Sequence, residues 1–115
     1  MDITIYHNPR CSNSRNTLAL LQETGHTPRV VDYLATPPAR EELVHMLAAA
    51  GLRPREAMRP KESLYGELGL DGPEVSDAAL IDAMLAHPVL MNRPFVVTPK
   101  GVRLCRPPET VRDIL

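Results

Sequence analysis

The chain has 115 residues, of which 43% are hydrophobic and 3% aromatic, and its formal net charge is -1. This length suits one domain spanning residues 1–115. The near-neutral charge argues against nucleic acid or an anionic membrane as a partner, and no apolar run approaches the ~20 residues of a membrane span.

The first expected element is a strand over residues 3–6, followed by a helix over 12–24 and a second strand over 29–33. Strand, helix and strand in this order form a βαβ unit, in which the two strands lie parallel. Gly25 is suited to end the helix, because glycine adopts the left-handed conformation at that position readily.

The middle of the chain, about residues 36–87, contains no convincing strand and is predicted to be a helical insertion. Four helical segments are expected there, over residues 36–50, 53–58, 63–68 and 76–87. Thr36, Pro37 and Pro38 are suited to begin the first segment, and Ser76 is suited to cap the last one, which Pro88 ends.

Strand character returns near the C-terminus. Residues 95–97 and 102–105 are predicted to form a hairpin around a tight turn, and residues 107–114 a short helix. The order βαβ, helical insertion, ββα predicts an α/β protein: a thioredoxin-like mixed sheet within a single domain.

The two cysteines are Cys11 and Cys105. Two cysteines are too few for a secreted disulfide scaffold, and the N-terminus lacks the basic and apolar stretches of a signal peptide. We therefore expect a cytoplasmic protein with free thiols. Cys105 ends a strand, where a passive role is expected to outweigh a redox one.

Cys11 is the candidate reactive group because it falls at the start of the first helix. Free N–H groups and the helix dipole favour a negative charge at that position, and Arg10 and Arg15 add positive charge. These influences lower the pKa of a cysteine, and the thiolate is the nucleophile. The sequence therefore predicts a reactive thiolate.

Ser14 stands where a Cys-x-x-Cys oxidoreductase has its second cysteine, so the site is monothiol. A disulfide formed at Cys11 would need an outside thiol, such as glutathione or a glutaredoxin, to resolve it. The Ser14 hydroxyl is placed either to donate a hydrogen bond to the thiolate or to cap the helix. His7 is placed either to lower the pKa of Cys11 as imidazolium or to fix the loop by hydrogen bonding.

Three Arg-Pro dipeptides begin at Arg59, Arg93 and Arg106. Guanidinium groups bind tetrahedral oxyanions through paired, charge-assisted hydrogen bonds, and proline restricts the neighbouring backbone. The three arginines are therefore candidate oxyanion ligands. A thioredoxin-like fold places a cis-proline at the start of its third strand, which predicts a cis Arg93–Pro94 bond. No Cys/His spacing suits a zinc ion, so no metal site is expected.

The chain closely resembles the glutaredoxin-dependent arsenate reductase family, and specifically its short members. The matching segments span nearly the whole chain. They are residues 3–11, 14–18, 33–34, 37–38, 68–70, 87–88, 92–94, 96–99 and 103–107, and they include the specific motifs Asn-Pro-x-Cys and Asn-Arg-Pro. The chain stops soon after Arg106-Pro107, without the C-terminal extension of the longer members.

The resemblance implies a thioredoxin-like arsenate reductase in which the Cys11 thiolate attacks arsenate. It implies that Arg59, Arg93 and Arg106 bind the oxyanion and that His7 and Ser14 tune the cysteine. Glutathione is implied as co-substrate and glutaredoxin as partner, with no bound cofactor.

Two alternatives share the fold. A general monothiol oxidoreductase acting on glutathione adducts would not require the three arginines. A Spx-like transcriptional regulator usually has a Cys-x-x-Cys switch, which Ser14 removes. A phosphatase-type arsenate reductase needs Cys-x5-Arg, and Thr17 at that position excludes it.

Overall fold

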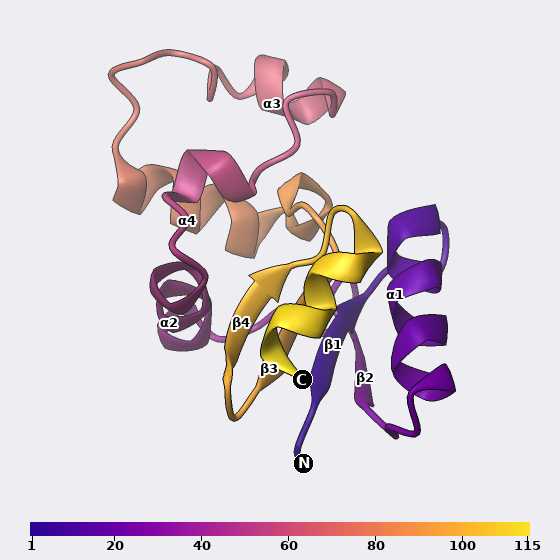
Figure 1. Ribbon diagram of the computed structural model, residues 1–115. Helices are drawn as coiled ribbons and strands as arrows, with labels where there is room; N and C mark the ends of the chain where they lie inside the picture. The colour runs from indigo at the N-terminus through magenta and orange to yellow at the C-terminus, as the bar shows by residue number, and fades with distance from the viewer. The chain divides into compact units, whose positions relative to one another are not determined.

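The computed structural model describes all residues from Met1 to Leu115, which form two compact units. Unit 1 comprises residues Met1–Thr36 and Arg93–Leu115, and unit 2 comprises Pro37–Asn92. Figure 1 shows the sheet of unit 1, with the N- and C-termini near each other. Unit 2 corresponds to the predicted helical insertion and extends to Asn92, five residues past the expected end at about 87.

The sheet of unit 1 has four strands in the order β2-β1-β3-β4. The strands are β1 (Thr4–His7), β2 (Arg29–Asp32), β3 (Phe95–Thr98) and β4 (Gly101–Leu104). β1 pairs parallel with β2 and antiparallel with β3, and β3 pairs antiparallel with β4. The predicted thioredoxin-like βαβ…ββα topology is therefore confirmed.

One core cluster joins the sheet to two helices of unit 1. Helix α1 (Ser12–Glu23) and the 3-10 helix η3 (Pro108–Ile114) contact each other. The cluster consists of Ile3, Ile5, Leu21, Val96, Cys105, Val111 and Ile114, all at most 4% exposed. Because it joins Leu21 of α1 and Val111 of η3 to Ile5 of β1 and Val96 of β3, it packs both helices against the centre of the sheet.

The β3–β4 hairpin has a defined register in which Phe95 lies opposite Leu104 and Thr98 lies opposite Gly101. Beyond the open end, the Cys105 N–H donates to the Pro94 carbonyl oxygen over 2.9 Å. This register brings the segment before β3 beside the segment after β4, so residues 93–94 and 105–106 lie at one end of the hairpin.

Unit 2 is helical. It contains α2 (Arg40–Ala50), η1 (Pro54–Ala57), α3 (Ser63–Glu67), α4 (Asp77–Ala86) and η2 (Pro88–Leu90). Helix α4 contacts α2, η1 and η2, so it is the centre of the unit. One isolated bridge, between Met58 and Met91, is the only β-pairing in it.

Helix α2 begins at Arg40, not at residues 36–38 as predicted. Pro38 disfavours the helical conformation of Pro37 before it, so the segment stays extended up to the N-cap, Ala39. The Glu42 carboxylate accepts a hydrogen bond from the Ala39 N–H over 3.4 Å. The prediction mistook a proline-rich approach for the first turn.

Ser76 caps α4 as predicted, since its hydroxyl oxygen accepts the Ala79 N–H over 3.1 Å. We expect Ser76→Ala to lower the free energy of unfolding by about 1 kcal/mol, because a helix N–H loses its acceptor. Urea unfolding checks this. Ser76→Asn, which keeps a side-chain acceptor, is the matched control and should unfold close to wild type. An equal loss in both variants would contradict the capping role.

No helix in the structure combines the length and the apolar character needed to cross a lipid bilayer.

Candidate active site around Cys11

The turn that joins β1 to α1 places Cys11 at the N-cap of the helix. The Cys11 N–H donates to the Asn8 carbonyl oxygen over 3.0 Å, and the Cys11 carbonyl oxygen accepts the Arg15 N–H over 3.0 Å. Asparagine at the first position and proline at the second are favoured in such a turn. Cys11 is 8% exposed, and its side chain lies at the N-terminus of α1, where the helix N–H groups and the helix dipole favour a thiolate.

The pKa of Cys11 lies below its ordinary value of 9.0. Burial is the largest single influence and opposes ionisation, but hydrogen bonds and charge together outweigh it. Among the influences that lower the pKa, the largest is a hydrogen bond from the Ser14 backbone N–H, followed by the interactions with Arg93 and Arg106. The expectation of a lowered pKa is confirmed, and the helix N-terminus contributes as predicted, but the positive charge comes from Arg93 and Arg106 and not from Arg10 and Arg15.

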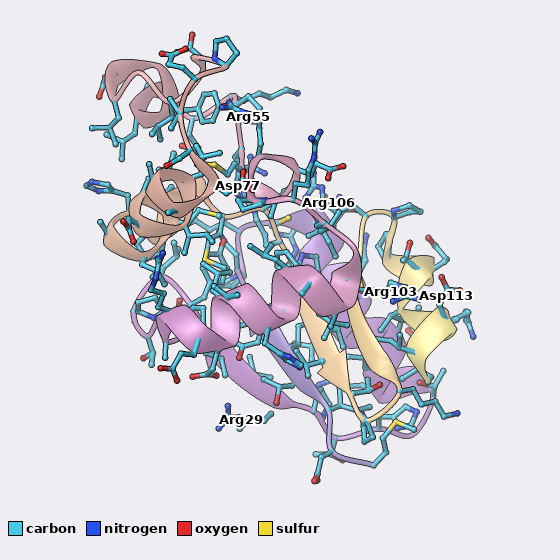
Figure 2. The ribbon with its side chains drawn as sticks, turned by 90° about the vertical axis from the view of Figure 1, so that its left-hand side faces the viewer. Arg29, Arg55, Asp77, Arg103, Arg106 and Asp113 are labelled. Atoms are coloured by element: carbon cyan, nitrogen blue, oxygen red, sulfur yellow. The ribbon has the colours of Figure 1, made fainter.

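Arg106 lies beside the sulfur. Its Nη1 is 3.6 Å from Cys11 Sγ and also donates to the Arg93 carbonyl oxygen over 2.9 Å. Figure 2 shows Arg106 in the loop that leads from β4 to η3. The Arg93–Pro94 peptide bond is cis as predicted, and the Arg106–Pro107 bond is cis as well. The hairpin thus brings two of the three candidate oxyanion ligands to the reactive cysteine.

The side chains of His7 and Ser14 are hydrogen-bonded to each other. His7 Nδ1 and Ser14 Oγ are 2.6 Å apart, and Ser14 Oγ also accepts the Asn8 N–H over 3.0 Å. The hydroxyl therefore takes neither of its two expected roles, since it neither bonds the thiolate nor caps the helix. It is the Ser14 backbone N–H that reaches the sulfur.

The imidazole of His7 is mainly neutral at pH 7, because burial lowers its pKa below 6.5. The charge of Arg15 acts in the same direction, and that of Asp32 opposes it. Of the two alternatives for His7, the structure favours fixing the loop through Ser14. The Arg15 guanidinium donates to the Pro9 carbonyl oxygen over 2.9 Å, so it holds the same turn.

Arg59 belongs to unit 2. Its guanidinium lies 3.4 Å from a Glu62 carboxylate oxygen and donates to Asn92 Oδ1 over 3.3 Å. These contacts hold the head group by its Nε and one Nη. Its assignment as a third oxyanion ligand stays a prediction from the sequence.

Cys105 is placed as a core residue. It lies one position past β4, is 0% exposed and packs among the apolar side chains of the unit 1 core. Burial raises the pKa of its thiol to about 12. A thiol so seldom ionised is a poor nucleophile, in agreement with the passive role expected for it.

The raised pKa of Cys105 predicts a loss of stability in alkali. Below pH 9 the thiol is neutral in both states, and between pH 9.0 and about 12 the unfolded chain releases a proton that the folded chain retains. The free energy of unfolding should therefore fall over this range. Urea unfolding at several pH values checks this, with Cys105→Ala as the reference: its curve should fall less steeply. Parallel curves would contradict the assignment.

Two residues near Cys11 were given no role in the predicted site. Asn8 entered the prediction only through the Asn-Pro-x-Cys motif and Tyr33 only as a strand end and part of a matching segment, yet both are buried and hydrogen-bonded to each other. The predicted parallel pairing of the two strands could have indicated that Asn8 and Tyr33 lie side by side. The register pairs His7 with Asp32, so the next residues of both strands, Asn8 and Tyr33, are neighbours.

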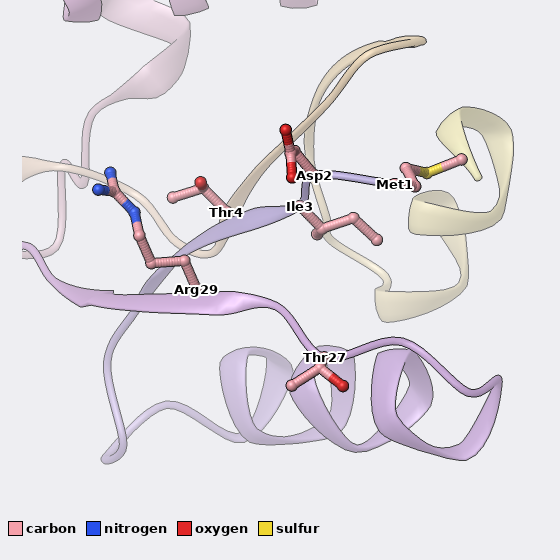
Figure 3. Close-up of a pocket in the computed structure, with 6 residues that line it drawn as sticks. All are labelled: Met1, Asp2, Ile3, Thr4, Thr27 and Arg29. Atoms are coloured by element: carbon pink, nitrogen blue, oxygen red, sulfur yellow. The ribbon is translucent and has the colours of Figure 1, made fainter.

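A surface hollow lies elsewhere in unit 1. It is lined by Met1, Asp2, Ile3, Thr4, Thr27 and Arg29 (Figure 3). These residues are at the N-terminal ends of β1 and β2, whereas Cys11 follows the C-terminal end of β1. The hollow contains no cysteine and is not assigned to the chemistry of Cys11. No group of three or more His, Cys, Asp or Glu side chains is placed to hold a metal ion.

Comparison with known proteins identifies the relatives of the chain. The sequence is 59% identical over 115 residues to the arsenate reductase of Rhizobium meliloti strain 1021, covering 100% of this chain and 82% of that one. It is 52% identical over 114 residues to the arsenate reductase of Escherichia coli K12, covering 99% and 81%. The solved structure of the arsenate reductase from Vibrio cholerae matches with a TM-score of 0.96 at 50% identity, covering 100% and 98%. Residues 6–114 match the ArsC family, so the chain belongs to that family.

Proposed function

We propose that the protein is an arsenate reductase that uses the Cys11 thiolate as its nucleophile and glutathione and glutaredoxin as its reductants. The main support is the position of Cys11 Sγ, which has a lowered pKa and lies 3.6 Å from a guanidinium nitrogen of Arg106. An anionic sulfur beside a cation is suited to attack the central atom of an oxyanion. Its relatives named arsenate reductase, at 52–59% identity, support arsenate as that oxyanion.

In the first step the thiolate attacks arsenic, a sulfur–arsenic bond forms, and one arsenate oxygen leaves as water after taking up protons. Arg93 and Arg106 bind the remaining oxygens, because charge-assisted hydrogen bonds suit a tetrahedral anion. Arg59 is proposed as the third such ligand. Arsenic stays in the +5 state through this step.

In the second step the thiolate of glutathione attacks the Cys11 sulfur. A sulfur–sulfur bond forms while the sulfur–arsenic bond breaks, and its electron pair reduces arsenic to the +3 state, which leaves as arsenite. Ser14 cannot supply a second thiol, so a glutaredoxin thiol removes glutathione from Cys11 and restores the starting enzyme.

The neighbouring polar residues are proposed to keep the sulfur ionised. Ser14 donates through its backbone, while His7 and Arg15 hold the turn in place. Pro94 is proposed to face Cys11 from the start of β3. A cytoplasmic location is proposed with these roles, since glutathione keeps thiols reduced there.

A coupled assay tests this function. Purified protein with glutathione, glutaredoxin, glutathione reductase and NADPH should consume NADPH when arsenate is added. A matched reaction should replace arsenate with a small glutathione mixed disulfide. Turnover of the disulfide without any turnover of arsenate would support the general monothiol oxidoreductase instead.

A further inference from the structure

Asn8 has hydrogen bonds from both its backbone and its side chain in the turn before Cys11, although none of the proposed chemistry uses it. Its side chain is buried, with 7% of the residue exposed. Its carbonyl oxygen accepts the Cys11 N–H and its own N–H donates to Ser14 Oγ, each over 3.0 Å. Asn8 is thereby bonded to the reactive cysteine and to the residue whose backbone N–H reaches the sulfur.

The Asn8 side chain fixes the same turn from a second direction. Its Oδ1 accepts the Arg10 N–H over 3.0 Å, a bond that closes the turn locally. Its Nδ2 donates to the hydroxyl oxygen of Tyr33 over 3.4 Å. Because one side-chain end holds the turn and the other meets a residue outside it, the amide links the turn to the rest of unit 1.

Tyr33 is a rigid partner for that amide. It is 1% exposed and directly follows β2, next to Asp32, which pairs with His7 of β1. A hydroxyl at such a site keeps a hydrogen-bond partner, since an unsatisfied buried polar group costs about 1–3 kcal/mol. The parallel strands therefore hold the Tyr33 hydroxyl in one place relative to Asn8.

We propose that Asn8 and Tyr33 are positioning residues for Cys11, in that the amide anchored to the Tyr33 hydroxyl holds the 8–11 turn so that Sγ meets the Ser14 N–H and Arg106. This proposal rests on the proposed function for its catalytic consequence. Both are proposed to act on the sulfur through the turn, which their hydrogen bonds hold. Its direct consequence is on the ionisation of Cys11, which is measurable without arsenate.

The test compares three substitutions in a Cys105→Ala background, where the ultraviolet absorbance of thiolate reports Cys11 alone. Asn8→Ala removes both side-chain hydrogen bonds. Asn8→Ser keeps a short acceptor for the Arg10 N–H but cannot reach Tyr33. Tyr33→Phe removes the hydroxyl and keeps the buried ring. The pKa of Cys11 and its rate of alkylation by iodoacetamide are measured for each variant.

We expect Asn8→Ala to raise the pKa of Cys11 by about one unit, because the sulfur loses its alignment with the donors that stabilise its charge. Asn8→Ser and Tyr33→Phe should raise it in the same direction by less. Arsenate turnover of Asn8→Ala should fall ~10-fold in kcat/KM, since misplacement of a reacting group is costly.

Thr98→Val is the matched control for a loss that is only structural. Thr98 is also 7% exposed in unit 1, and its hydroxyl bridges Ile114 O and Lys100 N–H over 2.6 and 3.0 Å. It should lower stability and leave the pKa of Cys11 unchanged. The proposal is overturned if Asn8→Ala and Tyr33→Phe leave that pKa at the wild-type value, or if Thr98→Val shifts it equally.

Different measurements test the catalytic function and the positioning of Cys11. A wild-type protein without arsenate turnover would refute the proposed function, while the pKa series would still test the positioning of Cys11. Normal arsenate turnover with an unchanged pKa in the Asn8 and Tyr33 variants would refute the positioning role alone.

Discussion

Replacing Cys11 with serine should abolish arsenate-dependent NADPH consumption in the glutathione- and glutaredoxin-coupled assay. A serine hydroxyl is not ionised at neutral pH and cannot form the mixed disulfide that the second step requires. The residual rate should equal that of the reaction without protein. Serine is nearly isosteric with cysteine, so the loss would reflect chemistry and not a change in packing.

Cys105→Ala is the matched control for that experiment, since it removes the other thiol of the chain. It should keep arsenate turnover while lowering the free energy of unfolding, because the side chain is fully buried in the core. Mass spectrometry after incubation with arsenate and glutathione should find the glutathione adduct on Cys11 in this variant. Substantial turnover by Cys11→Ser, or an adduct confined to Cys105 in the wild type, would refute the assignment.

Arg106→Ala should give the second-largest effect, a ~10²–10³-fold fall in kcat/KM for arsenate, in the range found when one donor to a developing anion is removed. The Arg106→Ala substitution removes two interactions at once. The oxyanion loses a ligand, and the sulfur loses the nitrogen that lies 3.6 Å away, which raises the pKa of Cys11. Steady-state kinetics over a pH series separate them, since the second loss recovers at higher pH.

Two further variants define the Arg106 result. Arg106→Lys retains the charge but not the planar guanidinium, which can donate two parallel hydrogen bonds to an oxyanion, so it should recover only part of the activity. Arg103→Ala is the matched control from the same hairpin; its guanidinium lies 3.9 Å from Asp113, beside it in Figure 2. Equal losses in Arg103→Ala and Arg106→Ala would show a general electrostatic effect instead of a local one.

The sequence predicted the fold well because its patterns are local. The strand at residues 29–33 and the hairpin at 95–105 follow from short apolar runs bounded by turn residues, and the observed strands differ by one residue at their ends. The start of α2 was misplaced because of the two successive prolines. Proline is favoured in the first turn of a helix, but Pro38 disfavours the helical conformation of Pro37 before it.

The site was predictable where one side chain and one helix end determine the chemistry. Cys11 needed only its place before α1 to be recognised. The direction of the Ser14 hydroxyl was not predictable, because it depends on whether His7 or Cys11 competes better for it in three dimensions. The Asn8–Tyr33 bond joins residues 25 positions apart and follows only from the strand register.

The pairing of β3 with β4 has a practical consequence for altering the protein. The distance between the two arginines depends on which residues of the strands face each other, not on how many residues connect them at Pro99 and Lys100. Extra residues could be inserted at that tip, for a label or a fused peptide, without displacing either guanidinium. Shifting one strand by a single residue would separate them and would also turn the buried side chains of that strand to the opposite face of the sheet.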